Sequence, residues 1–121
     1  MHQVKRLDLL LRAVARRMQQ CVREADTIGR VGGDEFEVLL PTIVDAEQAL
    51  VVAEKIRQAL NQPFELTGGY VVSISSSSGV AIYPEDGEDE STLSRAADAA
   101  MYRAKALGRD NVQFYRPGLV M

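Results

Sequence analysis

Apolar residues recur every three to four positions in three stretches of the chain, roughly residues 7–24, 45–62 and 91–107. This spacing places them on one face of a helix and predicts three amphipathic α-helices. The first stripe consists of Leu7, Leu10, Leu11, Val14, Ala15, Met18 and Val22. The third stretch is rich in alanine and is the clearest helix of the three.

The residues at the ends of two of these stretches suit helix caps. Asp45 stands three positions before Gln48, which is the spacing of a capping box, and this predicts the start of the second helix. Ser91 or Thr92 is the expected N-cap of the third helix. Gly108 suits the left-handed position that follows a helix C-terminus.

Short apolar runs around two pairs of glycines predict β-hairpins, because glycine supplies the positive φ that tight turns need. The pairs are Gly32-Gly33 and Gly68-Gly69. The expected strands are residues 27–31, 36–40, 64–66, 70–83 and 112–115.

The serine-rich stretch from Val71 to Ile82 has two interpretations. Its run of serines resembles a low-complexity linker, whereas the β-branched residues at both ends favour a strand. We favour the strand, whose small side chains would allow a helix to pack closely against it.

The order helix, hairpin, helix, strands, helix, strand predicts an α+β fold with a mixed or antiparallel sheet covered by helices. A length of 121 residues fits a single domain. We expect a leading segment at residues 1–6, a core at 7–115 and a tail at 116–121.

Composition and charge exclude several classes of protein. Apolar residues make up 46% of the chain and charged residues 26%, as in ordinary globular domains rather than disordered chains. A net charge of −3 gives no basic surface for nucleic acid or for an anionic membrane. No apolar run is long enough to span a bilayer. Cys21 is the single cysteine, so no internal disulfide forms, and we expect a cytoplasmic protein.

The first candidate for chemistry is the turn that carries Gly32, Gly33, Asp34 and Glu35. Two adjacent carboxylates offer the oxygen ligands that Mg²⁺ prefers, and glycines without side chains let a nucleotide approach the backbone. The alternative is a solvated hairpin bend with acidic residues.

Two further clusters are charged. Lys105 and Arg109 flank the end of the third helix, where their alternative role is to compensate the helix dipole. Arg23 and Asp26 are three residues apart, and their alternative role is a surface ion pair. Phosphate-binding loops of the GxxxxGK[ST] and GxGxxG types are absent.

The combination of these clusters resembles the GGDEF family of diguanylate cyclases. The resemblance rests on RVGGDEF at residues 30–36, VSIS at 72–75, SGVA at 78–81, Tyr83-Pro84, ADAAMYRAK at 97–105 and GRDN at 108–111. These motifs occur in the family's order over roughly residues 8–115. The resemblance implies a domain that condenses two GTP molecules into cyclic di-GMP in a bacterial second-messenger pathway, with Mg²⁺ as cofactor and with two domains facing each other as a homodimer.

The resemblance also implies roles for individual residues. Gly32 and Gly33 would lie under the GTP, while Asp34 and Glu35 would serve metal binding and proton transfer. Lys105 and Arg109 would hold the triphosphate.

Two further roles follow from the same resemblance. Arg23 and Asp26 match the RxxD of the family's inhibitory product site, five residues before the glycine pair, with Lys55 or Arg57 as candidates for its second arm. Asp8 matches a guanine-contacting aspartate after a slip of two residues in the register.

The chain departs from the family pattern at its start, because a DxDxFKxIND stretch with a second metal-binding aspartate is absent. We therefore expect this chain by itself to make no cyclic di-GMP. In family members the corresponding strand lies between the second hairpin strand and the serine-rich strand. Without it, we expect either association with another chain through a sheet edge or pairing of these two strands with each other.

Two other functions stay open beside the cyclase. The chain could be a receptor that binds cyclic di-GMP through Arg23 and Asp26 without catalysis, or a structural fragment without a ligand. Descent from an active cyclase is favoured by the match of four residues to the catalytic pattern, namely Asp34, Glu35, Lys105 and Arg109.

Overall fold

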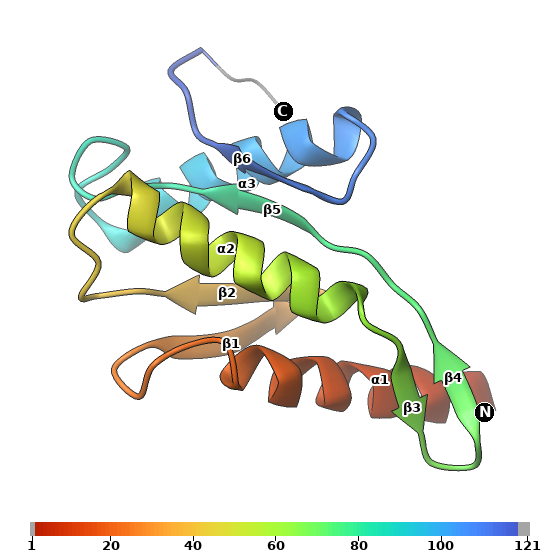
Figure 1. Cartoon of the computed structure of the whole chain (residues 1–121). Coiled ribbons are helices and arrows are strands. Elements are labelled where there is room, and N and C mark those ends of the chain that lie inside the picture. Colours follow the sequence, from red (N-terminus) through yellow and green to blue (C-terminus); the bar gives the residue numbers. More distant parts are fainter. Residues whose placement is uncertain (1, 119–121) are drawn as a thin grey trace.

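The computed structural model describes residues 2–118, with side chains described for residues 7–118. Helices and strands alternate in the order that the sequence predicts (Figure 1). They are α1 His2–Gln19, β1 Thr27–Gly32, β2 Glu35–Leu39, α2 Ala46–Asn61, β3 Phe64–Leu66, β4 Tyr70–Val72, β5 Ser77–Val80, α3 Glu90–Ala106 and β6 Asn111–Phe114. None of these helices is both long and apolar enough to cross a membrane within the described part of the chain.

The fold is α+β as predicted, but the strands within residues 2–118 form three separate two-stranded sheets rather than one. β1 pairs with β2 and β3 pairs with β4, both antiparallel, whereas β5 and β6 run parallel. β2 and β5 do not pair, so the prediction that these two strands close on each other is wrong. Phe36 and Val38 of β2 pack against the main core cluster, and this burial holds β2 in place without a second strand partner.

The main core cluster lies between α1, α2 and the β3–β4 hairpin. Its buried residues are Val14, Met18, Cys21, Ile56, Leu60, Phe64 and Leu66. Phe64 is the largest side chain in it and is 2% exposed. The Arg17 guanidinium stacks on the Phe64 ring and donates hydrogen bonds to the carbonyls of Ala59, Gln62 and Pro63. These hydrogen bonds of Arg17 hold α1 against the end of α2.

A second layer forms where α3 packs on β5 and β6 (Figure 1). The buried face of α3 consists of alanines, and Ala100 and Ala104 are 0% exposed. A Cβ at Gly79 of β5 would collide with the backbone of α3 at Ala97 and Met101. The small residues of the serine-rich stretch therefore do allow close helix packing, as the sequence predicts.

Helix α1 differs in its bounds from the range expected. It begins at His2 and ends at Gln19, where the last turn tightens through a hydrogen bond from the Cys21 amide to the Met18 carbonyl. Cys21 and Val22 still pack against the core from the turn that follows. The apolar periodicity therefore continues beyond the helix that it predicts.

Two further predictions need correction. The stretch 70–83 is not one strand, because β4 pairs with β3 and β5 pairs with β6, with residues 73–76 unpaired between them. The N-cap of α3 is Asp89 rather than Ser91 or Thr92. The Asp89 carboxylate accepts a hydrogen bond from the Thr92 amide at 2.7 Å, the bond that an N-cap makes to the third helical residue.

Candidate functional site

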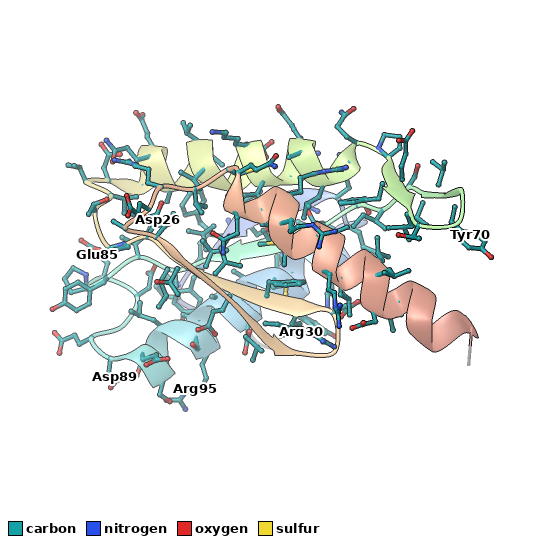
Figure 2. The ribbon with its side chains drawn as sticks, turned by 90° about the horizontal axis from the view of Figure 1, so that it is seen from below. Asp26, Arg30, Tyr70, Glu85, Asp89 and Arg95 are labelled. Atoms are coloured by element: carbon teal, nitrogen blue, oxygen red, sulfur yellow. The ribbon has the colours of Figure 1, made fainter. Side chains whose placement is uncertain are left out.

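The bend of the β1–β2 hairpin is open to solvent and shaped by glycine. Gly33 has φ +52°, and a Cβ at Gly32 or Gly33 would meet no atom within 4 Å. The Arg30 side chain donates to the Gly33 carbonyl at 2.8 Å and closes the bend. Figure 2 shows Arg30 at this end of the hairpin and Asp26 at the other. The open face above the glycines leaves the backbone accessible to a ligand.

Asp34 and Glu35 follow the glycines directly, with Asp34 exposed and Glu35 half-buried. No hydrogen bond or ion pair engages either carboxylate in the described part of the chain. Among residues 7–118, no group of three or more acidic, His or Cys side chains could hold a metal ion. The bend therefore offers two carboxylates, a number that suits a Mg²⁺ ion sharing phosphate oxygens and water.

The end of α3 is a Schellman motif that presents Lys105 and Arg109. The Arg109 amide donates to the Ala104 carbonyl at 3.0 Å and the Gly108 amide to the Lys105 carbonyl at 3.2 Å. Gly108 has φ +111°, which confirms its predicted place after the helix. Within residues 7–118, neither the Lys105 nor the Arg109 side chain has an ion-pair or hydrogen-bond partner. Both cations are therefore available to an anionic ligand.

Figure 1 shows the bend and the C-terminal end of α3 toward the same side of the molecule. No hydrogen bond or ion pair among the described residues joins Asp34 or Glu35 to Lys105 or Arg109. Their binding of one common ligand stays a prediction.

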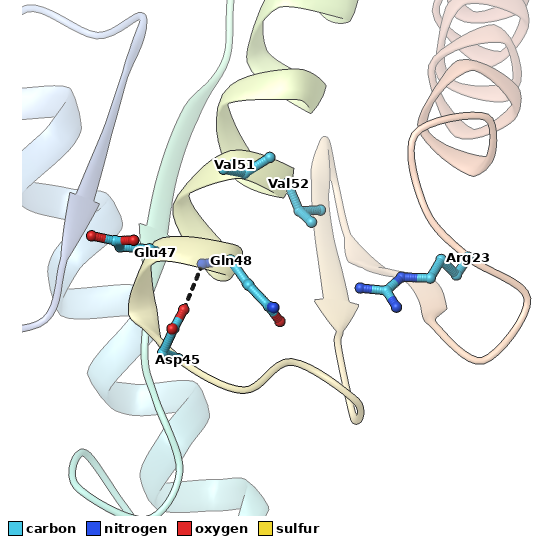
Figure 3. Close-up of a pocket in the computed structure, with 6 residues that line it drawn as sticks. All are labelled: Arg23, Asp45, Glu47, Gln48, Val51 and Val52. Carbon is cyan, nitrogen blue, oxygen red and sulfur yellow. Dashed lines mark hydrogen bonds between the residues drawn. The ribbon is translucent and has the colours of Figure 1, made fainter.

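Arg23 and Asp26 lie in the turn after α1, not within a helix. The Asp26 carboxylate accepts from the Arg23 backbone amide at 2.8 Å, and the Arg23 guanidinium is not paired with it. The surface ion pair considered for these two residues is therefore not formed. Instead, the Arg23 side chain points toward the N-terminal end of α2 (Figure 3).

A shallow cavity of about 380 Å³ separates Arg23 from α2 (Figure 3). Its lining residues are Arg23, Asp45, Glu47, Gln48, Val51 and Val52. The Asp45 carboxylate accepts from the Gln48 amide at 3.0 Å, which confirms Asp45 as the N-cap of α2. The cavity places the unpaired Arg23 guanidinium near the apolar Val51 and Val52, and the Asp45 and Glu47 carboxylates also line it.

Asp8 lies on α1 and is engaged in an exposed ion pair with Arg12 at 3.2 Å. Arg57, a candidate second arm for the Arg23 site, is bound to Glu54 and Asp110 instead.

The family model described as diguanylate cyclase, GGDEF domain, matches residues 5–111. The chain belongs to the GGDEF domain family. The match covers the hairpin bend, the cavity at Arg23 and the end of α3, so all three lie within one GGDEF domain.

Relatives of this GGDEF domain carry cyclase names. The bifunctional diguanylate cyclase/cyclic di-GMP phosphodiesterase MucR of Pseudomonas aeruginosa is 43% identical over 93% of this chain, which covers 16% of MucR. The diguanylate cyclase TpbB of Pseudomonas aeruginosa is 39% identical over 84% of the chain, which covers 23% of TpbB. The chain thus spans less than a quarter of either relative.

Solved GGDEF domains share the fold. The crystal structure of the GGDEF domain of TpbB has a TM-score of 0.86 and 36% identity, covering 90% of this chain and 68% of that one. The GGDEF domain of DgcB from Caulobacter crescentus, solved in complex with c-di-GMP, has a TM-score of 0.76 and 27% identity, covering 88% and 63%. These neighbours confirm the expected palm-like GGDEF fold.

One group of contacts in this GGDEF domain was not predicted from the sequence. Asp110 accepts hydrogen bonds from Arg57 at 3.0 Å and from Asn61 at 3.1 Å, and so joins the end of α3 to α2. The Asn61 bond and then the Arg57 bond lower the pKa of Asp110. The available signal was an aspartate two residues after a helix-ending glycine, since Asp tolerates the left-handed region better than most residues.

Proposed function

We propose that this chain is the GTP-binding part of a diguanylate cyclase domain. Asp34 and Glu35 would hold Mg²⁺ together with phosphate oxygens, while Lys105 and Arg109 bind the phosphates. Gly32 and Gly33 leave room for the nucleotide. The observation that carries the proposal is that the acids and the cations occur unpaired at GGDEF motif positions, on elements that this family shares.

The reaction places distinct demands on these residues. In cyclic di-GMP formation, each 3′-hydroxyl attacks the α-phosphorus of the other GTP, so that two P–O bonds form and two pyrophosphates leave. The Mg²⁺ that Asp34 and Glu35 would hold would neutralise phosphate charge and favour deprotonation of the attacking hydroxyl. Lys105 and Arg109 stabilise the charge that grows on the leaving pyrophosphate. Glu35 lies beside Asp34, where it can accept the hydroxyl proton.

Two domains must face each other for this reaction, because each holds one GTP. We therefore propose a homodimer as the active form and, since GTP is the substrate, a cytoplasmic location. We further propose that these 121 residues alone bind GTP without steady turnover, because the bend supplies two carboxylates and the described residues gather no third ligand beside them.

Calorimetric titration with GTP and Mg²⁺ tests the binding. We expect wild type to bind, and Lys105→Met to weaken binding roughly tenfold through loss of one charge-assisted contact. Arg95→Met is the control for the loss of one positive charge, because Arg95 is an exposed cation near the opposite end of α3. Absence of GTP binding by the wild-type chain overturns the proposal. Steady production of cyclic di-GMP would instead refute the expected lack of turnover.

The cavity at Arg23 supports a second function, the binding of cyclic di-GMP as a receptor. A guanidinium can bridge a phosphate and a guanine edge through its planar fork. In that case the chain binds the dinucleotide but not GTP, and Arg23→Ala abolishes binding. Glu24→Ala, in the same turn, is the control. Failure to bind either nucleotide would remove both functions.

A further inference from the structure

The loop after α3 has an unusual backbone. Gly108, Arg109 and Asp110 have φ values of +111°, +65° and +52°, so two consecutive non-glycine residues occupy the left-handed region. Side-chain-bearing residues adopt this region rarely, and they keep it where surrounding contacts over-determine it. The contacts of this loop therefore decide how Arg109 is presented.

Two sets of contacts hold the loop from opposite sides. On the α2 side, the Asp110 carboxylate accepts from Arg57 Nη1 at 3.0 Å and from Asn61 Nδ2 at 3.1 Å. On the α3 side, the Asn111 side-chain amide donates to the carbonyls of Ala104 and Arg109, at 2.9 Å each. Arg109 lies between these two anchors.

Arg57 is itself held in place. Its Nε and Nη2 donate to one oxygen of Glu54 at 3.0 and 2.9 Å, while its Nη1 remains for Asp110. The Arg57 side chain is 21% exposed, against 45% for Asp110. A planar guanidinium with two of its edges occupied is a rigid support for the loop.

The bond between Arg57 and Asp110 also engages the acidic side chain that follows Arg109 in the chain. The hydrogen bonds of Asn61 and Arg57 favour the ionised form of Asp110 and lower its pKa. An ionised carboxylate next to Arg109 would compete with an anionic ligand for the Arg109 guanidinium. The Asp110 carboxylate bonds to Arg57 instead of Arg109. The Arg109 side chain therefore has no partner in the described part of the chain.

We propose that Arg57 is a positioning residue for Arg109: by holding Asp110, it fixes the loop so that Arg109 and Lys105 are presented to the same phosphate groups. The inference rests on the proposed GTP binding. It assigns a ligand-presenting role to a residue of α2 that touches no nucleotide itself.

The test compares affinities for GTP, GDP and GMP by calorimetry in the presence of Mg²⁺. Arg57→Met is expected to weaken GTP binding roughly tenfold. The effect on GMP is expected to be small, because GMP lacks the terminal phosphates that Arg109 would contact. Arg16→Met, which removes an exposed arginine from α1, controls for the change in net charge.

The deciding variant is the double change Arg57→Met with Arg109→Ala. If Arg57 acts through Arg109, adding Arg57→Met to Arg109→Ala causes no further loss of GTP affinity. A merely structural role would lower affinity for all three nucleotides and would add fully in the double variant. Asn61→Ala removes one hydrogen bond to Asp110 without a change of charge. If Arg57→Met does not fold, Asn61→Ala can replace it in the single and double variants, with a smaller expected loss of GTP affinity.

The outcomes separate the two proposals. Wild type that binds no GTP overturns the proposed function, and the positioning role with it. Wild type that binds GTP, with loss in Arg109→Ala but wild-type affinity in both Arg57→Met and Asn61→Ala, overturns the positioning role alone. Full additivity in the double variant does the same.

Discussion

The two charged halves of the candidate site rest on supports of different kinds. Lys105 and Arg109 end a helix whose backbone approaches β5 closely at Gly79 and whose Ala100 and Ala104 are 0% exposed. Asp34 and Glu35 stand on a bend where a Cβ at either glycine would meet nothing within 4 Å. The cations are therefore fixed by tertiary packing, whereas the acids are placed by their own hairpin.

This difference has a consequence for binding. A ligand that meets a preorganised group loses little free energy in ordering it, whereas a mobile group must be ordered at the moment of binding. We expect the α3 end to provide the initial contacts with phosphate.

The largest effect is expected at the close contact between β5 and α3. Gly79→Ala adds a Cβ that collides with the α3 backbone at Ala97 and Met101, so α3 must shift. We expect a loss of about 3 kcal/mol of unfolding free energy, measured by urea denaturation. Gly29→Ala, on β1 with nothing within 4 Å, is the matched control and should change stability little. Equal effects of the two substitutions would contradict the packing contrast.

A smaller effect is expected at the bend. Gly33→Ala places a side chain at φ +52° in open space, so the cost is backbone strain alone, about 1 kcal/mol. Gly32→Ala, at the neighbouring position where no positive φ occurs, should stay close to wild type. A loss of stability in Gly32→Ala as large as that in Gly79→Ala would contradict the open surroundings of the bend.

The smallest effect concerns the far end of α3, where Asp89 is the N-cap (Figure 2). The Thr92 backbone bond holds the pKa of Asp89 below its ordinary value of 3.8. A lowered folded-state pKa contributes stability above the unfolded-state value, and this contribution is lost as the pH falls through the folded-state pKa. Asp89→Ala should lower Tm at pH 7 by roughly 3 °C, with a smaller difference from wild type at pH 3.

Asp89→Asn provides the control for this pH dependence, because asparagine caps a helix without titrating. Its difference from Asp89→Ala should be the same at both pH values in thermal unfolding scans. A difference between Asp89→Ala and wild type that does not shrink in acid would contradict the role of the ionised cap.

The sequence predicted the elements better than their pairing. Periodicity and glycine pairs located the helices and hairpins, because side-chain burial and turn geometry are local properties. The separation of β4 from β5 was not readable, since Ser73–Ser76 are compatible with a strand and only tertiary packing leaves them unpaired. The Asp89 cap was hidden in an acidic loop, where several residues could have served.

The site shows the same division. The motifs predict Asp34, Glu35, Lys105 and Arg109 as site residues, whereas the link from Asp110 to Arg57 spans 53 positions and depends on the fold. No pattern of neighbouring residues predicts a contact across such a separation. The cavity between Arg23 and the start of α2 likewise depends on the fold and not on a local sequence pattern.

We propose that the hairpin bend and the end of α3 bind one metal–nucleotide complex. Mn²⁺ takes oxygen ligands in the octahedral geometry of Mg²⁺ and broadens the NMR signals of nearby amides, so titration with Mn²⁺ and GTP tests the claim directly. We predict broadening at both Gly33–Glu35 and Lys105–Asp110, and loss of both effects without GTP at the same low Mn²⁺ concentration. Broadening at one region alone would show that the acids and the cations do not share a ligand.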